Sequence, residues 1–479
     1  MSWSRSPQLV LGYQRPLPRV AARFARPLTL RGSEIHQHMH VIGLTGQGKS
    51  RFLASKFVQL HTQGIACGLI DPHSDLALDC LRLLIERGER LDGSGERPLL
   101  YIDFTRRDAY LPFNILQQST DAHTVARNLV EICKRAWPAL ANGAAPTFEN
   151  ILLHATVVLI ENRQPITLMS RLLTDKHYRD MSLSRVHDEQ VVHFFRLRYD
   201  AWGREGALMR ESTLNRVALL TFSPTLRYSL GQRENALDFR RHIDAGISVI
   251  YNLGGLDEAT QTFLGCLLTV GYEVAALSRA QTPDAERRPW HLLIDEFAQL
   301  SATTETALAR VLSLARKYGL FLTLAHQHWS QVSARLSGAL QNTLAVAFKL
   351  GRSDAEWAAP HFGQFRPDAI KHLVSDPQAL GRTHPLFVPL QETFEAWTAA
   401  LEDLQPREAY VKHAGTAVKI RTTEISPSQQ DSADLAAVID GYRQQLLRPA
   451  NQVIDEVEGL LRGPASRTSH TRRVILGDR

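Results

Sequence analysis

The key to the architecture is His40-Val-Ile-Gly43-Leu-Thr-Gly-Gln-Gly48-Lys49-Ser50, where a strand runs into a phosphate-binding loop. Gly43, Gly48, Lys49 and Ser50 meet the pattern G-x-x-x-x-G-K-[ST]. The glycines allow consecutive backbone N–H groups to wrap a phosphate. Lys49 would place its charge between the β- and γ-phosphates, and the Ser50 hydroxyl would bind Mg²⁺. The stretch therefore predicts binding of a nucleoside triphosphate with Mg²⁺.

The residues on both sides of the loop support this interpretation. Val41 and Ile42 favour a strand, and residues 51–60 place four apolar side chains at helical spacing. The anion would thus lie at a helix N-terminus. The alternative is a chance glycine-rich turn. We assign nucleotide contacts to the loop and the first helical residues: Gly43, Thr45, Gly46, Gly48, Lys49, Ser50 and Arg51.

Length and composition limit the number of domains and the general class of the protein. With 479 residues, it is long enough for two or more modules around a sizeable core. Hydrophobic residues make up 44% and charged residues 22%, as in ordinary globular proteins. The net charge of +6 permits binding to nucleic acid without demanding it.

The cysteines and the apolar runs indicate a cytoplasmic protein. The longest apolar run, residues 263–277, contains Glu273 and is too short to span a membrane. The arginine- and proline-rich N-terminus lacks the apolar core of a signal peptide. We expect a soluble chain without direct membrane insertion. Four scattered cysteines are expected to be buried thiols rather than disulfide or zinc ligands: Cys67, Cys80, Cys133 and Cys266.

The order of predicted elements indicates one α/β domain with a helical insertion. From His36 onward, uninterrupted apolar strands alternate with helices, which argues for a parallel sheet covered on both faces. Amphipathic helices replace the strands between about Ser119 and Asp244. Before this domain, residues 27–30 are the one clear strand candidate, and residues 409–422 alternate as a β-hairpin. The expected divisions are an N-terminal extension, core, insertion, core, hairpin region and helical basic tail: 1–35, 36–118, 119–244, 245–373, 374–426 and 427–479.

Paired carboxylates follow a second apolar strand, in Leu292-Leu-Ile-Asp295-Glu296. Asp295 would hold the Mg²⁺ shell through water. Glu296 would accept a proton from the water that attacks the γ-phosphate. This pairing is typical of enzymes that hydrolyse a nucleotide to do work. The alternative is a solvated strand end.

Two further polar groups flank the strand at residues 320–325. Gln327, just beyond its carboxyl end, can bind the γ-phosphate or the attacking water. Arg316 and Lys317 lie at the opposite end, too far to reach the same nucleotide easily. Arg316 could reach the nucleotide of a neighbouring subunit as an arginine finger. Otherwise it is a charged helix end that the macrodipole favours.

Other candidates have weaker support. His73 and Asp75 follow the second strand, at the sheet edge where ligands bind α/β proteins. Either side chain could contact nucleotide or a neighbouring subunit, or Asp75 could simply cap the next helix. Arg352 is a second candidate finger, or a loop arginine without a catalytic task.

These residues resemble the HerA/FtsK superfamily of ring-shaped DNA-translocating ATPases, and within it soluble relatives of TraD-type conjugative coupling proteins. The resemblance implies a RecA-like core, ATP at the interfaces of a homohexamer, and DNA in a central channel. It also implies that Arg316 acts in trans and that Gln327 senses the γ-phosphate. Most of the chain carries the likeness, in residues 38–43, 69–75, 144–150, 293–297, 315–319, 325–327 and 348–355.

Two departures from that family qualify the resemblance. Ser74 stands where the family's Asp-Pro-His-Gly-Asp turn has glycine, which leaves the role of His73 less certain. The N-terminal membrane helices of secretion coupling proteins have no counterpart here, so we do not expect a membrane-anchored pump unless a partner supplies the anchor.

The resemblance leads to the expectation of an ATP-driven translocase of double-stranded DNA, feeding a nuclease, a relaxase or a defence effector. A nucleotide-switched scaffold that holds and regulates an effector is the alternative. A small-molecule kinase is disfavoured by the carboxylate pair and Gln327. Three arginines of the insertion are either DNA-phosphate contacts or members of solvated helix faces: Arg204, Arg210 and Arg216.

Overall fold

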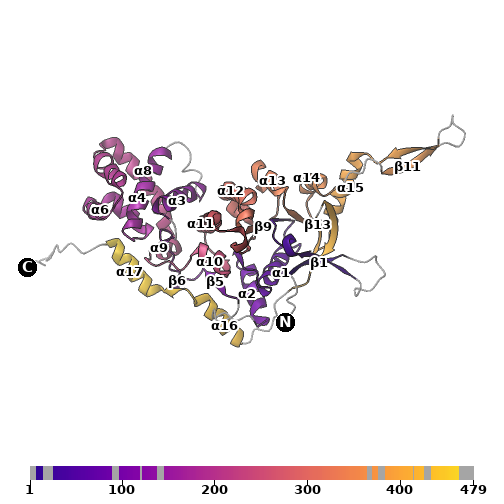
Figure 1. Ribbon diagram of the computed structural model, residues 1–479, viewed down its shortest axis with the longest axis horizontal. Coiled ribbons are helices and arrows are strands. Elements are labelled where there is room, and N and C mark those ends of the chain that lie inside the picture. Colours follow the sequence, from indigo (N-terminus) through magenta and orange to yellow (C-terminus); the bar gives the residue numbers. More distant parts are fainter. Residues whose placement is uncertain are drawn as a thin grey trace, which may run out of the picture. The chain divides into compact units, whose positions relative to one another are not determined.

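The chain forms two compact units in a computed structural model (Figure 1). The sheet unit comprises Met1–Arg106, Arg127–Ala145 and Asp238–Leu446, and the helical unit comprises Arg107–Ala126, Pro146–Leu237 and Leu447–Arg479. The structure describes residues 7–14, 25–88, 97–118, 121–136, 145–363, 369–375, 383–413, 415–425 and 433–462.

The sheet unit is built on seven parallel strands at the centre of an 11-stranded sheet. Their residues are almost all buried, because helices cover both faces, as the uninterrupted apolar runs predict. Parallel strands present their carboxyl ends at one edge, so the polar residues that follow them meet there. In spatial order the seven strands are β10 (Leu344–Ala347), β3 (Met39–Ile42), β9 (Leu320–His326), β8 (Trp290–Ile294), β4 (Cys67–Asp71), β7 (Ser248–Asn252) and β5 (Leu99–Asp103).

Antiparallel strands extend the sheet beyond β10. The hairpin predicted near residues 409–422 and the strand predicted at 27–30 are both present. A strand at residues 8–14 was not predicted, and all four strands join the main sheet instead of forming separate extensions. They are β13 (Glu408–His413), β14 (Thr416–Arg421), β1 (Gln8–Gln14) and β2 (Arg26–Arg31).

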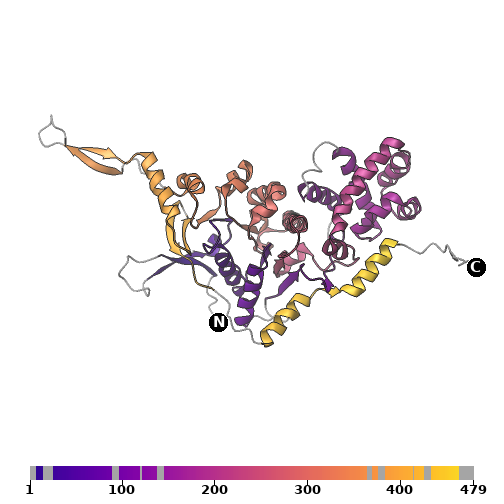
Figure 2. The same cartoon turned by 180° about the vertical axis from the view of Figure 1, so that it is seen from behind.

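Two groups of helices cover the sheet (Figures 1 and 2). One face carries α1 (Lys49–Thr62), α2 (Asp75–Glu86) and α16 (Ala433–Gln444). The other carries α10 (Phe239–Ala245), α11 (Glu258–Leu277), α12 (Phe297–Leu314) and α13 (Ala334–Leu340). Short 3₁₀ turns link these elements: η2 (Gly32–Glu34), η6 (Ser278–Gln281), η7 (Asp284–Glu286), η8 (Ala315–Tyr318) and η9 (Trp329–Gln331).

Helix α11 is the single helix, among the described residues, that is long and apolar enough to cross a membrane. Its apolar segment is 72% buried inside the protein. Glu273 within it is buried and pairs with Arg310 of α12 at 3.2 Å. Burial against α10 and α12 accounts for its apolar composition as a core helix.

A second hairpin lies apart from the main sheet. It consists of β11 (Ile370–Ser375) and β12 (Thr383–Phe387), and follows α14 (Arg352–Phe362) in the chain. Helix α15 (Leu390–Glu402) comes next and packs on α14. Several apolar side chains of the hairpin are about half exposed: Ile370, Leu373, Val374, Leu386 and Phe387.

The helical unit contains most of the predicted insertion. Residues 447–462 at the other end of the described chain also belong to it, because Val453 and Val457 pack against Tyr110. Helix α3 (Ala122–Ala136) starts in this unit and ends in the sheet unit. The remaining elements are β6 (Ala109–Tyr110), α4 (Ala145–Glu161), η4 (Ile166–Leu168), α5 (Met169–Thr174), α6 (Lys176–Leu183), α7 (Glu189–His193), the π-helical η5 (Phe194–Tyr199), α8 (Arg204–Phe222), α9 (Pro224–Leu230), β15 (Arg448–Pro449) and α17 (Ala450–Arg462).

The predicted α/β fold class with a helical insertion is confirmed by these elements. The prediction of buried thiols is confirmed as well, since all four cysteines are buried thiols. Burial raises the pKa of the Cys67 thiol to about 12, so it stays protonated.

Candidate nucleotide site

The loop after β3 has the backbone that a phosphate cradle requires. Gly46 and Gly48 have φ of 76° and 106°, which residues with a side chain rarely adopt. A Cβ at Gly43 would lie 2.6 Å from the Cβ of Phe348, so glycine is needed there for close packing. Helix α1 begins at Lys49, and its first N–H groups are therefore available to an anion.

Lys49 is held inside the loop. Its ammonium donates hydrogen bonds to the carbonyls of Gly43, at 2.6 Å, and Leu44, at 3.1 Å. Burial lowers the pKa of Lys49, and the nearby charges of Glu296 and Asp295 oppose that shift. The side chain thus presents a desolvated cation at the point where the phosphates would lie.

Ser50 and Asp295 meet beside this lysine. The Ser50 hydroxyl donates to Asp295 Oδ2 at 2.8 Å, and Asp295 Oδ1 accepts the N–H of Glu296 at 3.0 Å. A hydroxyl and a carboxylate are the hard oxygen ligands that Mg²⁺ prefers. The two side chains therefore fit a magnesium ion that also binds water and phosphate oxygens.

Glu296, Gln327 and Thr45 form a chain of hydrogen bonds along the same edge. Gln327 Nε2 donates to Glu296 Oε2 at 3.1 Å, and Thr45 Oγ1 donates to Gln327 Oε1 at 2.9 Å. Glu296 is 4% exposed, and burial raises the pKa of its carboxyl group. The amide of Gln327 therefore connects the phosphate loop directly to the candidate base.

His73 lies at the border of this group. Its backbone N–H donates to Asp71 Oδ1 at 2.8 Å, and its Nε2 lies 3.3 Å from the amide nitrogen of Gln299. The Asp71 carboxylate also accepts from the N–H of Ala77 at 2.8 Å, so Asp71, not Asp75, caps the first turn of α2. Burial raises the pKa of Asp71 to about 6.

Two predicted nucleotide contacts are not brought into the group. Arg51 forms an ion pair with Asp79 of α2 at 2.6 Å. Arg352 forms ion pairs with Glu356 at 2.7 Å and Glu395 at 2.8 Å. Both guanidinium groups are thus neutralised within the chain, at its surface.

Arg316 lies in η8, at the opposite end of β9 from Gln327. Its side chain is exposed and, among the described residues, forms no hydrogen bond or ion pair. The seven residues of β9 separate the two ends by about 20 Å. Arg316 therefore cannot reach the phosphate loop of its own chain.

Arg407 is a residue of this region that sequence reasoning missed. It directly precedes β13 and has a φ of 71°, and its N–H donates to the carbonyl of Gln47 in the phosphate loop at 2.9 Å. Its guanidinium pairs with Glu424 at 2.6 Å. No local pattern marks it, because its position beside Gly48 follows from sheet pairing between distant strands.

Comparison with known proteins identifies the fold. No family model matches the sequence, and no curated protein matches it. Among solved structures, the unbound bacterial conjugative coupling protein TrwBdeltaN70 aligns with a TM-score of 0.56 at 15% identity, over 84% of this chain and 88% of TrwB. The chain has the TrwB fold.

A second protein of known structure, VirB4, has a similar fold. VirB4 of Thermoanaerobacter pseudethanolicus aligns with a TM-score of 0.53 at 12% identity, over 89% of this chain and 97% of VirB4. TrwB in complex with ADP and Mg²⁺ aligns with a TM-score of 0.54 at 15% identity, over 88% of this chain and 96% of TrwB. The predicted resemblance to conjugative coupling proteins is confirmed as a likeness of fold.

Proposed function

We propose that this protein is a magnesium-dependent ATPase. The observation that carries the proposal is the joining of the phosphate loop to the paired carboxylates: Ser50 to Asp295, and Thr45 through Gln327 to Glu296. The complex of TrwB with ADP and Mg²⁺ supports it, because the two chains share a fold.

The side chains suit hydrolysis by in-line attack of water. Lys49 would neutralise the β- and γ-phosphate oxygens, and Ser50 and, through water, Asp295 would hold Mg²⁺, which would stabilise their charge. Gln327 orients a water molecule, and Glu296 takes its proton as the new oxygen–phosphorus bond forms and the bond to the β-phosphate oxygen breaks. The buried carboxylate is a stronger base than an exposed one, because its pKa is raised.

The work done by this ATPase is proposed to be translocation of double-stranded DNA by a homohexamer in the cytoplasm. The separation of Arg316 from its own phosphate loop supports an assembly in which Arg316 completes the site of the next copy. The DNA would be delivered to a nuclease, a relaxase or a defence effector.

The helical unit offers a surface for that DNA. Arg163, Arg185 and Arg233 line one concavity together with several side-chain amides, and carboxylates are absent from the residues that line it. Arg163 has a φ of 53° at the C-terminus of α4, where glycine is usual. Of the arginines predicted to touch DNA, Arg210 lies over the ring of Tyr199. The side chains of two others lie outside the described residues: Arg204 and Arg216.

A nucleotide-switched scaffold is the second candidate function. The exposed apolar side chains of the β11–β12 hairpin favour it, because they suit contact with another protein. In this case the assembly would hold and regulate an effector, and DNA would not change the rate of hydrolysis.

The deciding experiment measures ATP hydrolysis with and without duplex DNA, and displacement of a protein roadblock from that DNA. Lys49→Ala should abolish ATP binding or turnover, and Glu296→Gln should bind ATP but not hydrolyse it. Six-fold particles in electron micrographs, with duplex DNA through the ring, would agree with a motor. Full biological function of an assembled Glu296→Gln protein would exclude it.

A further inference from the structure

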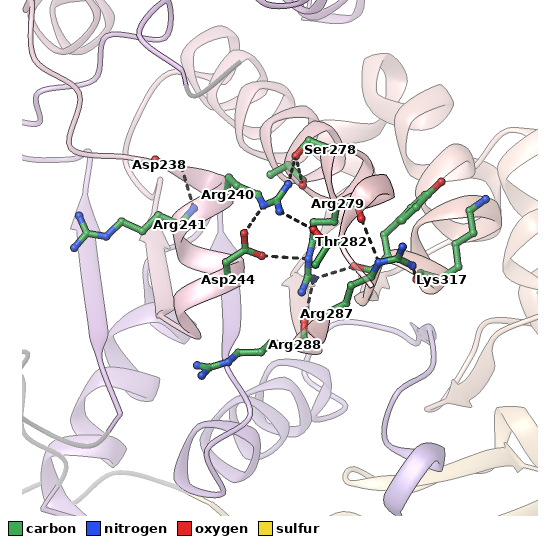
Figure 3. Close-up of polar contacts among 12 residues, drawn as sticks. Asp238, Arg240, Arg241, Asp244, Ser278, Arg279, Thr282, Arg287, Arg288 and Lys317 are labelled. Atoms are coloured by element: carbon green, nitrogen blue, oxygen red, sulfur yellow. Dashed lines mark hydrogen bonds and ion pairs between the residues drawn. The ribbon is translucent and has the colours of Figure 1, made fainter. Parts of the chain in front are cut away.

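Arg279 is a fully buried cation that the proposed chemistry leaves unexplained. It lies in η6, after α11, and its Nη1 donates to the carbonyl of Tyr318 at 2.8 Å and to that of Arg288 at 3.0 Å. Its Nε pairs with Asp244 Oδ1 at 3.2 Å. Figure 3 shows Arg279 beside Asp244 and Arg288, within a group of basic side chains.

Burial of a guanidinium is costly unless its contacts compensate for the lost water. Asp244 balances the charge, but Nη2 is buried and has no hydrogen-bond partner among the described residues. The two carbonyls are therefore the contacts that explain an arginine here. Gly319, with a φ of 80°, permits the approach, since a Cβ at this position would lie 3.0 Å from Nη1.

The carbonyl of Tyr318 belongs to η8, the turn that carries Arg316. The last carbonyls of a helix lack partners within it, and an arginine can satisfy them. Arg287 makes a second contact of this kind, since its Nη1 donates to the carbonyl of Lys317 at 2.8 Å and its Nε donates to that of Arg279 at 3.2 Å. The main chain just after Arg316 is thus fixed by two guanidinium groups.

We propose that Arg279 is a positioning residue for Arg316. It fixes η8 so that the exposed Arg316 guanidinium is presented, in a defined direction, to the nucleotide of a second copy of this chain. The inference rests on the proposed function of Arg316 as a finger in trans. A preorganised turn loses less freedom when the finger engages, and misplacement of a catalytic group by 1 Å can cost about 100-fold in rate.

Arg240 provides a matched control. Like Arg279, it contacts the carboxylate of Asp244, to which its Nε donates a hydrogen bond. Its other contacts are the hydroxyls of Ser278, at 2.8 Å, and Thr282, at 3.1 Å (Figure 3). It makes no hydrogen bond to the turn that carries Arg316, so its loss should leave the finger in place.

The experiment compares Arg279→Met with Arg240→Met and Arg316→Ala in the full-length protein. We expect Arg279→Met to lower kcat by about tenfold or more, with KM within about twofold of wild type. Arg240→Met should change neither constant by more than about twofold. Arg279→Lys, which keeps the charge on a single donor nitrogen, should recover part of kcat.

Mixed assemblies separate positioning from general damage. Arg279→Met subunits keep an intact phosphate loop, so co-expression with Glu296→Gln subunits, whose fingers are intact, should restore hydrolysis. Co-expression with Arg316→Ala subunits should not, because both lack a working finger. If Arg279→Met does not fold, the same mixtures with Arg287→Met, which removes the neighbouring contact, test the turn.

The outcomes distinguish the two hypotheses. If Arg316→Ala hydrolyses ATP at the wild-type rate, Arg316 is not an arginine finger, and this part of the proposed function is wrong. An inactive Arg316→Ala together with a fully active Arg279→Met would overturn the positioning role alone. Restored hydrolysis in mixtures of Arg279→Met with Arg316→Ala would also overturn the positioning role, because the finger of the Arg279→Met subunits would then be working.

Discussion

Ser74 and Glu296 hold their backbones in the left-handed region beside the nucleotide site, with φ of 78° and 42°. Such residues cost about 1–3 kcal/mol each, and surrounding contacts must enforce them. Glu296 lies two residues beyond the end of β8, immediately before α12, and its strained backbone aims a buried carboxylate toward Gln327. Ser74 makes no comparable hydrogen bond and packs against Gly254. The strain at Glu296 therefore serves the site, whereas the strain at Ser74 has no such use.

Ser74→Gly should stabilise the sheet unit by about 1 kcal/mol, because glycine adopts this φ without strain. Urea unfolding followed by tryptophan fluorescence measures the change. Ser74→Ala keeps the strain and serves as the control, so it should not raise the midpoint. Equal midpoints for the glycine variant and wild type would show that the position carries no strain.

Gln327→Leu should lower kcat about 100-fold while ATP still binds. The variant removes the amide that connects Thr45 to Glu296 but leaves Lys49 and Ser50 in place. Single-turnover hydrolysis and binding of a fluorescent ATP analogue measure the two effects separately. Gln341→Leu, at an exposed glutamine just after α13, is the control. A parallel loss of binding in Gln327→Leu would instead make Gln327 a ground-state contact.

At the scale of elements, the central strands β3 and β9 share a buried pair of histidines. His40 Nε2 lies 2.6 Å from His326 Nε2. Burial lowers the pKa of His326 to about 4 and that of His40 well below its ordinary value. Both rings are therefore neutral in the folded sheet at neutral pH, while in the unfolded chain they titrate near pH 6.5.

Stability should fall as the pH drops from about 6.5 toward 4. In this window the unfolded chain binds protons that the folded sheet does not, so protonation favours unfolding. Urea midpoints at pH 7.5 and 5 measure the loss. His326→Gln should show a smaller loss than wild type, while His177→Gln, at an exposed position in α6, should match wild type. An unchanged loss in His326→Gln would assign the pH dependence to other groups.

The concavity of the helical unit supports a prediction about DNA. Neutralising Arg163 and Arg185 to glutamine should weaken duplex binding and reduce the slope of log affinity against log salt by about 2. Fluorescence anisotropy across a salt series measures both quantities. Replacing the exposed Arg196 and Arg198 of η5 removes the same charge elsewhere on this unit. Equal slopes for the two double variants would show that the concavity is not a specific DNA-binding site.

Short-range patterns predicted the sheet and much of the candidate site. The loop around Lys49 and the carboxylates after β8 each follow a strand, so their meeting at one edge follows from parallel pairing alone. Arg407 and Arg279 could not be found this way. Their positions depend on contacts with Gln47 and Tyr318, which lie far away in the sequence and have no periodicity that marks them.

At the scale of the whole molecule, the two halves of the proposed active site lie at opposite ends of β9. Gln327 belongs to the edge with the phosphate loop, and Arg316 belongs to the other. Contact between unlike edges of identical copies is heterologous, and it forms a closed ring when the rotation closes. If Arg316 acts in trans as proposed, a single copy holds a complete binding site but an incomplete catalytic one.

ATP hydrolysis per chain should consequently rise with protein concentration, whereas ATP binding per chain should not. Dilution separates the copies and withdraws Arg316 from the neighbouring site, but it leaves the loop around Lys49 intact. Mass photometry at each concentration gives the fraction of assembled chains for comparison with the specific activity. Arg316→Ala should assemble like wild type and stay inactive throughout. Because isolated copies lack the finger, hydrolysis at the full rate by single chains would place the whole active site within one copy.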